Sequence, residues 1–124
     1  MTGNPTAGDT IFHKIMRREI PADIVHEDEH LIAFRDIAPQ APVHVLFVPK
    51  ETVPTLDALQ PGQEALVGRL VLAAAAYARR EGIADDGYRM VMNCNDDGGQ
   101  TVFQLHLHLL GGAPLDGFGS RSEA

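Results

Sequence analysis

Residues 98–110 read Gly-Gly-Gln-Thr-Val-Phe-Gln-Leu-His-Leu-His-Leu-Leu and constrain the fold more than any other part of the chain. From residue 103 onward apolar and polar side chains alternate strictly, which is typical of a β-strand with one buried face. The apolar face carries Phe103, Leu105, Leu107 and Leu109, and the opposite face carries Gln104, His106 and His108. We expect a strand over 103–111 whose leucines pack against a helix, with the two histidines about 6 to 7 Å apart on the other face.

The long helix that could cover those leucines is predicted at residues 63–80. Its apolar positions recur at spacings of four, three and four residues, and a glycine follows where the helix should end. These positions are Leu66, Leu70, Ala73 and Tyr77, followed by Gly82. A short helix is expected to start at Asp9 or Thr10 as its cap and to end before Pro21.

Short runs rich in Val, Ile and Phe predict the other strands at 24–29, 31–37, 44–50 and 88–94. Pro54 and Pro61, within and just after residues 52–60, predict a loop or irregular turn there. The order of elements favours an α+β domain with an antiparallel sheet of about five strands, one long helix and one short helix. Residues 10–118 should form this single domain. Residues 1–9 and 119–124 are small and polar, so we expect flexible tails there.

Composition excludes several classes of protein. The chain has 124 residues, a single cysteine and a formal net charge of −7. One cysteine can form neither an internal disulfide nor a structural zinc site by itself, and an acidic surface is unsuited to nucleic-acid polymers or anionic membranes. The sequence contains no apolar run long enough to cross a membrane, and its first residues do not match a signal peptide. We therefore expect a cytoplasmic protein.

Two histidines on one strand face, which His44 could join from a neighbouring strand, indicate a chemical site. Three uses are open: binding a metal, general acid–base catalysis, or nucleophilic attack on phosphorus. Metal binding is the least favoured, because the nearby acids Asp96 and Asp97 lie in a loop before the glycines. The other histidines, at positions 13, 26 and 30, are interpreted as surface residues.

The residues just before the histidines favour phosphorus. Gly98 and Gly99 let backbone N–H groups approach an anion, while Gln100, Thr101 and Asn93 offer uncharged donors. Such a site can hold one phosphate without lysine, which agrees with the acidity of the chain.

The segment 104–110, Gln-Leu-His-Leu-His-Leu-Leu, resembles the signature of the histidine-triad (HIT) family of nucleotide hydrolases and transferases, His-φ-His-φ-His-φ-φ with φ apolar, except at its first position. Residues 11–22, 33–50 and the Gly-Gly-Gln-Thr-Val run are similar to the Hint branch of that family. The resemblance implies that His106 is a nucleophile that forms a covalent nucleotidyl-histidine, released by water as a nucleoside monophosphate. It implies that His108 contacts the phosphate and leaving-group side, that His44 completes the polar network and that Thr101 lies near the leaving group.

The resemblance also implies a nucleotide pocket. Asp36 matches the acid that binds ribose hydroxyls, and an apolar wall holds the purine. The wall is matched by Ile11, Phe12, Phe34, Ile37 and Leu46, and the phosphate-side residues by Asn93, Gly99, Gln100, Thr101 and Val102. The resemblance implies no cofactor and no metal, and it implies a homodimer in which the two sheets join.

Gln104 departs from the family pattern, because an amide cannot exchange a proton near neutral pH. If the first triad position shuttles protons, activity should fall. If it acts through its backbone carbonyl, which would hold the N–H of His106, glutamine can substitute, and we favour this second hypothesis. The expected activity is hydrolysis of purine nucleoside phosphoramidates or related acyl-nucleotides. The alternatives are a purine-nucleotide-binding module with weak or lost turnover, and a dinucleoside polyphosphate hydrolase.

Overall fold

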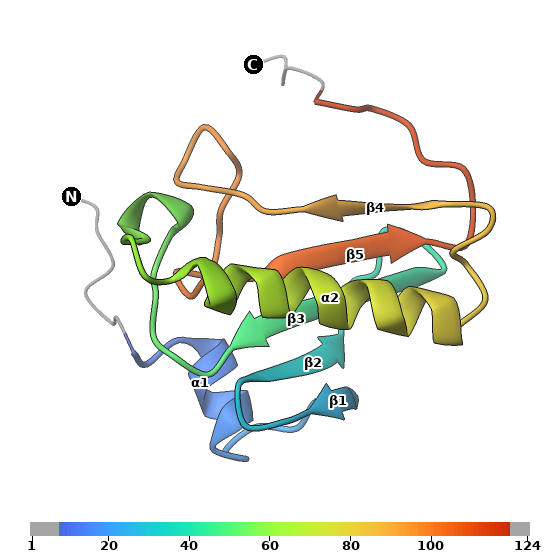
Figure 1. Ribbon diagram of the computed structural model, residues 1–124. Helices are drawn as coiled ribbons and strands as arrows, with labels where there is room; N and C mark the ends of the chain where they lie inside the picture. The colour runs from blue at the N-terminus through green and yellow to red at the C-terminus, as the bar shows by residue number, and fades with distance from the viewer. Residues whose placement is uncertain (1–7, 120–124) are drawn as a thin grey trace.

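A computed structural model describes residues 8–119 as an α+β fold built on one antiparallel sheet, which confirms the predicted fold class. The strands are β1 (Ile24–Glu27), β2 (Leu31–Arg35), β3 (Val43–Pro49), β4 (Tyr88–Val91) and β5 (Leu107–Gly111), in the spatial order β1-β2-β3-β5-β4. The helices are α1 (Ile11–Met16), the 3₁₀ turn η1 (Leu56–Ala58) and α2 (Glu64–Arg80). Figure 1 shows α2 lying along one face of the sheet.

The face of the sheet under α2 holds the larger apolar core. Along β3, Val45 and Phe47 point to this face, and across the ladder they pair with Leu109 and Leu107 of β5. Leu70 and Ala74 of α2 are completely buried against them. Ala74 is fully buried, whereas Ala73, the predicted position, is only partly buried against the same core, and these small side chains allow the helix to approach the sheet closely.

The opposite face is covered by α1. Phe12 and Ile15 pack with Phe34, Leu46 and Ile32, which project from β2 and β3 away from α2. The helix begins at Thr10, whose hydroxyl accepts the N–H of His13 while the imidazole of His13 accepts the N–H of Thr10. This reciprocal cap satisfies two backbone donors that a helix end leaves unpaired. Thr10 is thus the cap, one of the two residues predicted for it.

The last strand is shorter than the prediction of 103–111, because regular pairing begins only at Leu107. The ladder between β3 and β5 ends at the pair Phe47–Leu107, although β3 continues beside β2 to Pro49. Residues 104 and 105 instead contact segment 49–53, which consists of Pro49 and the irregular residues after it. Leu105 still lies in the core under α2, and its N–H donates to the carbonyl of Val53 at 2.7 Å. The burial of Leu105, Leu107 and Leu109 was predicted correctly, whereas Phe103 lies outside that core cluster. β1, β2 and β4 also end two or three residues earlier than predicted.

His13 was wrongly predicted to be a surface residue. It is 6% exposed, because its imidazole is part of the helix cap and its Nε2 lies 3.3 Å from Thr52 Oγ1. The predicted tails, 1–9 and 119–124, fall mostly outside the described residues. Asp9, one of the tail residues that the structure does describe, forms an ion pair with Arg17 at 2.8 Å. Among the described residues, no helix is both long and apolar enough to cross a membrane.

Candidate active site

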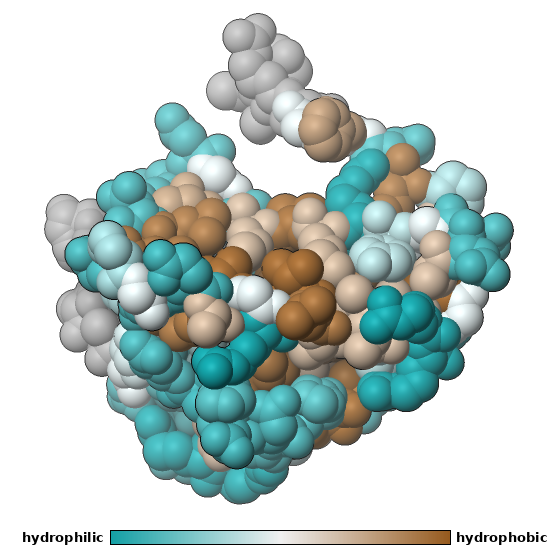
Figure 2. All heavy atoms as spheres, in the orientation of Figure 1, coloured by the Kyte–Doolittle hydropathy of each residue, from teal (hydrophilic) through white to brown (hydrophobic). Residues whose placement is uncertain are grey.

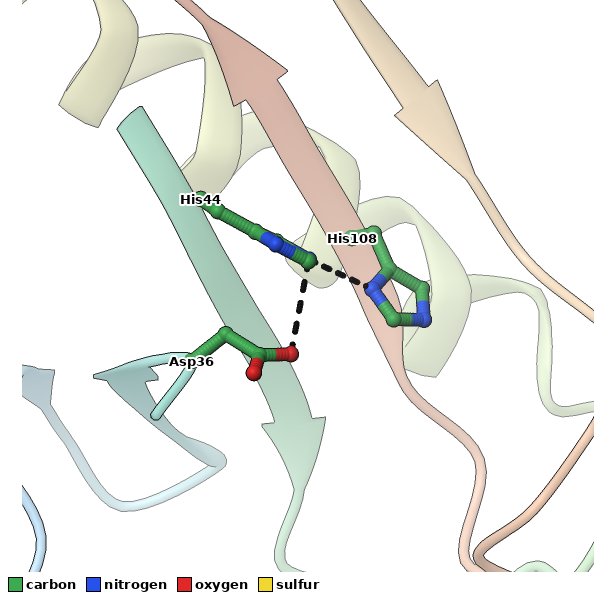
Figure 3. Close-up of side chains that lie close together, drawn as sticks. All are labelled: Asp36, His44 and His108. Atoms are coloured by element: carbon green, nitrogen blue, oxygen red, sulfur yellow. Dashed lines mark hydrogen bonds and ion pairs between the residues drawn. The ribbon is translucent and has the colours of Figure 1, made fainter. Parts of the chain in front are cut away.

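Asp36, His44 and His108 lie close together (Figure 3), although His108 is 64 residues after His44 in the sequence. Asp36 follows the end of β2, His44 is the second residue of β3, and His108 is the second residue of β5. His44 Nε2 lies 2.9 Å from His108 Nδ1 and 3.5 Å from a carboxylate oxygen of Asp36. The prediction that His44 reaches the face that carries His108 is therefore confirmed, and Asp36 joins them.

The backbone fixes the proton positions on His44 and His108. The N–H of Gln40 donates to His44 Nδ1 at 3.1 Å, so this nitrogen must be unprotonated and Nε2 must carry the hydrogen of the neutral ring. His44 Nε2–H can then donate to His108 Nδ1, which leaves His108 Nε2–H as the outward donor. A fixed N–H donor of this kind can donate a proton to a group bound beside it.

His106 is held in the complementary tautomer. Its Nδ1 lies 2.7 Å from the backbone carbonyl oxygen of Gln104, an acceptor only, so Nδ1 must carry the hydrogen. The lone pair is then on Nε2, the nitrogen that points away from this carbonyl. His106 is 7% exposed, and its ring packs at 5.0 Å between centroids from that of His108. The arrangement presents one nucleophilic nitrogen next to one N–H donor.

Burial keeps these imidazoles neutral. Loss of hydration lowers the pKa of His106 and of His44 below the usual value of a histidine. Burial, followed by repulsion from the other two imidazoles, lowers the pKa of His108 to about 4. All three rings are therefore unprotonated near neutral pH. A neutral His106 is the form that can attack an electrophile.

Two residues that were predicted to contact phosphate, Gln100 and Asn93, form hydrogen bonds that stabilise the loop before the histidines. Gln100 is 6% exposed; its Nε2 donates to the carbonyls of Pro54 and Val102, and its Oε1 accepts the N–H of Asn95. Asn93 Nδ2 donates to the carbonyl of Gly98 at 2.6 Å. These amides shape the loop from within, so their contact with phosphate stays a prediction.

Gly98 and Gly99 are glycine for different reasons: Gly98 has no room for a side chain, and Gly99 has a positive φ. A side chain at Gly98 would come within 2.4 Å of the Cys94 carbonyl oxygen, whereas Gly99 has a φ of +80° and its N–H donates to the carbonyl of Asp96. Gln100 N–H donates to Asn95 O, so two of the amides that could approach an anion are used in the turn itself. The hydroxyl of Thr101 is on an exposed residue at the end of the loop.

The residues predicted for the apolar wall divide into two groups. Phe12, Phe34 and Leu46 form one buried cluster, with Val102 packed against it. Ile11 is 48% exposed and Ile37 is 93% exposed, so neither is part of that cluster. The buried part of the predicted wall lies directly beside His106, because Phe12 contacts the ring of His106 at 4.9 Å between centroids.

Among residues 8–119, Asp36, His44 and His108 also form a group that could hold a metal ion, with ligand atoms within 4.8 Å of one another. Asp36 supplies the carboxylate of this group, whereas Asp96 and Asp97, the acids considered from the sequence, do not belong to it. A histidine that binds metal through Nε2 normally donates its other N–H to an acceptor. Here Nδ1 of His44 faces the N–H of Gln40, a donor, so a metal on Nε2 would have to displace its proton and break that bond. The donor set fits a metal poorly.

Two participants were missed from the sequence. Gln40 acts through its backbone N–H, four residues before His44, and no side-chain pattern reveals such a role. His13 anchors the segment after β3 through Thr52. Its position three residues after Thr10 is the spacing of a helix capping box, which could have indicated burial.

This fold and this histidine motif agree with comparisons to known proteins. The HIT domain matches residues 17–115, so the chain belongs to the HIT family. Purine nucleoside phosphoramidase of Escherichia coli K12 is 53% identical to it over 109 residues, which cover 88% of this chain and 92% of that protein. An uncharacterised HIT-like protein of Synechocystis is 56% identical over 109 residues, 88% of this chain and 95% of its own length.

Solved structures show the same fold. A HIT family hydrolase from Legionella pneumophila superposes with a TM-score of 0.85 at 42% identity, covering 87% of this chain and 96% of that one. A HIT family hydrolase from Clostridium thermocellum superposes with a TM-score of 0.84 at 44% identity, covering 87% and 94%.

Proposed function

We propose that the protein hydrolyses purine nucleoside phosphoramidates or related acyl-nucleotides through a covalent nucleotidyl-histidine on His106. The observation that carries this proposal is the pairing of His106 Nδ1 with the Gln104 carbonyl in a buried, neutral imidazole. That pairing leaves Nε2 as a free nucleophile. The identity to the purine nucleoside phosphoramidase of E. coli supports the substrate class.

The reaction proceeds in two displacements at the α-phosphorus. His106 Nε2 attacks, a histidine N–P bond forms, and the bond from phosphorus to the leaving amine breaks as the amine takes a proton from His108 Nε2–H. Water then attacks the same phosphorus, the histidine N–P bond breaks, and the proton lost by water restores His108. The products are a nucleoside monophosphate and the free amine. The second displacement returns both imidazoles to their starting neutral form, because in the covalent intermediate His106 Nε2 carries the nucleotidyl group and His108 lacks its Nε2 proton.

The nucleotide is bound by groups on both sides of this pair. Asp36 Oδ1 accepts the N–H of Ala38 at 2.8 Å, which fixes the carboxylate beside His44. Its remaining acceptor capacity suits the two hydroxyls of a ribose. Phe12, Phe34 and Leu46 supply the apolar side of the site, with Ile11 and Ile37 at its exposed edge, and burial against them holds a purine with few polar contacts. Thr101, Gly99 and Val102 are on the phosphate side.

The test is to trap labelled nucleotide on the protein. Purified protein is mixed with a phosphoramidate labelled in its AMP moiety and quenched within one turnover. We expect label on the wild type and on His30→Ala, which removes an exposed imidazole, and none on His106→Ala. Release of AMP from an AMP-lysine phosphoramidate should exceed release from diadenosine polyphosphates. Tight nucleotide binding with neither label nor turnover would identify a binding module instead.

We propose that two copies associate through α2 and β4. β4 is at the edge of the sheet, so its outer backbone groups can pair with a second β4. On α2, Leu72 is 71% exposed and Val71 is 40% exposed, and Figure 2 shows apolar side chains gathered over this helix. Light scattering should give twice the chain mass, and Leu72→Glu should give the single chain mass.

A further inference from the structure

Gln104 stands where the HIT signature has its first histidine, and its side-chain amide is fully used in the protein interior. The residue is 0% exposed. Its Oε1 accepts the N–H of Val53 at 3.1 Å, and its Nε2 donates to the carbonyls of Pro49 at 3.0 Å and Glu51 at 2.8 Å. All three partners belong to segment 49–53, which consists of Pro49, the last residue of β3, and the irregular residues after it.

This segment directs one N–H donor, that of Val53, and two carbonyl acceptors, those of Pro49 and Glu51, toward the side-chain amide of Gln104. Residues 50–53 lie outside the strands, and a buried polar group without a partner costs its full desolvation penalty. A carboxamide carries one acceptor oxygen and two N–H donors at one end, which matches the set completely. A neutral imidazole has one donor and one acceptor, and a protonated one has two donors, so either form would leave a backbone group unpaired.

The same residue supplies the carbonyl that holds His106. Regular strand pairing begins at Leu107, so the sheet does not set the direction of the peptide at 104–105. Two links to segment 49–53 set it instead: the amide contacts of Gln104 and the bond from Leu105 N–H to Val53 O. His13 holds the segment from the side of α1 through Thr52. The carbonyl of Gln104 is thereby aimed at His106 Nδ1.

We infer that Gln104 is a positioning residue: by clamping segment 49–53 it fixes the tautomer of His106, and the backbone around it requires an amide and not a proton-exchanging imidazole. The consequence for catalysis rests on the proposed function of His106 as nucleophile. A proton shuttle at this position predicts that histidine improves the enzyme. The clamp predicts that histidine impairs it.

The experiment compares the wild type with Gln104→His and Gln104→Met, with Gln60→Met as the control because Gln60 is exposed in a turn. Methionine keeps the length of the side chain and removes its polar atoms. Nitrogen-15 NMR of the ligand-free proteins reads the tautomer of His106, and steady-state kinetics gives kcat and KM. We expect the Nδ1–H tautomer alone in the wild type and in Gln60→Met, and a mixture in both position-104 variants. In Gln104→His and Gln104→Met, kcat should fall by about tenfold or more, and KM should change much less.

A kcat for Gln104→His equal to or above that of the wild type would overturn the inference, as would an unchanged tautomer in Gln104→Met. The wild-type spectrum tests it even where a variant does not fold, because an Nε2–H tautomer of His106 contradicts the clamp directly. The spectra need no substrate, so they distinguish a failure of the clamp from a failure of the proposed reaction, which the label on His106 reports.

Discussion

Phe12 lies edge-on against His106, with ring centroids 4.9 Å apart and ring planes at 84°. The two side chains are 6% and 7% exposed, and Phe12 also packs edge-on against Phe34 at 5.4 Å. The helix α1 therefore contributes the group that removes water from one side of the proposed nucleophile. Loss of hydration is the largest cause of the lowered pKa of His106. A contact that stabilises the core thus also keeps the imidazole neutral.

Shortening Phe12 should raise the pKa of His106 and weaken the fold. Phe12→Leu retains most of the apolar contact and should cost about 1 kcal/mol in the free energy of unfolding, whereas Phe12→Ala should cost about 3–5 kcal/mol. Both variants admit water to the ring, so the pKa of His106, followed by NMR titration, should move toward its usual value, further in Phe12→Ala. Phe118→Leu is the control, since that ring is 88% exposed. An unmoved pKa in both Phe12 variants would refute the role of this contact.

The histidine cluster should make stability depend on pH in the range from about 6.5 down to about 4. The pKa values of His44, His106 and His108 are lowered in the folded protein, that of His108 to about 4. At a pH between these lowered pKa values and about 6.5, the histidines bind more protons in the unfolded chain than in the folded protein. The free energy of unfolding therefore falls as the pH falls. Each group contributes a slope of up to about 1.4 kcal/mol per pH unit. Carboxylates with lowered pKa, such as Asp28 at about 2, act below this range.

Urea unfolding at pH 7.5, 6.5, 5.5 and 4.5 measures this dependence. His108→Gln should be less sensitive to pH than the wild type over this range, and His30→Gln, which changes an exposed ring, should follow the wild type. Equal slopes in the wild type and His108→Gln would contradict the assignment of the effect to the cluster.

The sequence was sufficient for features that depend on local periodicity. The alternation at 105–109 predicted which leucines meet α2, and the spacing of Leu66, Leu70 and Tyr77 predicted the helix itself. Both patterns reflect one buried face per element, which any packed sheet and helix must satisfy. The start of β5 was misplaced because the alternation continues through residues 103–106, whereas the pairing with β3 stops at Phe47 and Leu107.

The proton positions in the site could not be predicted, because they depend on backbone groups that only the fold brings close. A hydrogen bond between His106 and the backbone carbonyl of Gln104 was one of two hypotheses drawn from the sequence, and the structure contains that bond. Nothing in the sequence indicated that the Gln104 amide reaches residues 49–53, or that the N–H of Gln40 orients His44. Backbone donors and acceptors carry no side-chain signature.

Gly98→Ala should disturb the loop in front of the site. An added Cβ would lie 2.4 Å from the Cys94 carbonyl oxygen and 2.8 Å from its nitrogen, and backbone atoms cannot yield as a flexible side chain can. The loop must shift, so turnover and nucleotide affinity should fall by about tenfold or more, at a cost of about 1–3 kcal/mol in stability. Gly68→Ala in α2 has open space around its Cβ and should stabilise the protein by about 0.5–1 kcal/mol with turnover unchanged. Equal kinetics in the two variants would contradict this role of Gly98.

Removal of metal ions should leave the activity intact. In the cluster Asp36–His44–His108, the Nδ1 atom of His44 accepts the N–H of Gln40, so Nε2 holds a proton that a metal would have to displace. Dialysis against a chelator should therefore change turnover by less than about twofold. Added Zn²⁺ should inhibit rather than activate, because it would take His108 Nδ1 and Asp36 away from their present contacts, and Asp36→Asn should weaken that inhibition. Loss of turnover on chelation, restored by a single metal, would show that the cluster is a metal site after all and that His44 changes its tautomer to bind it.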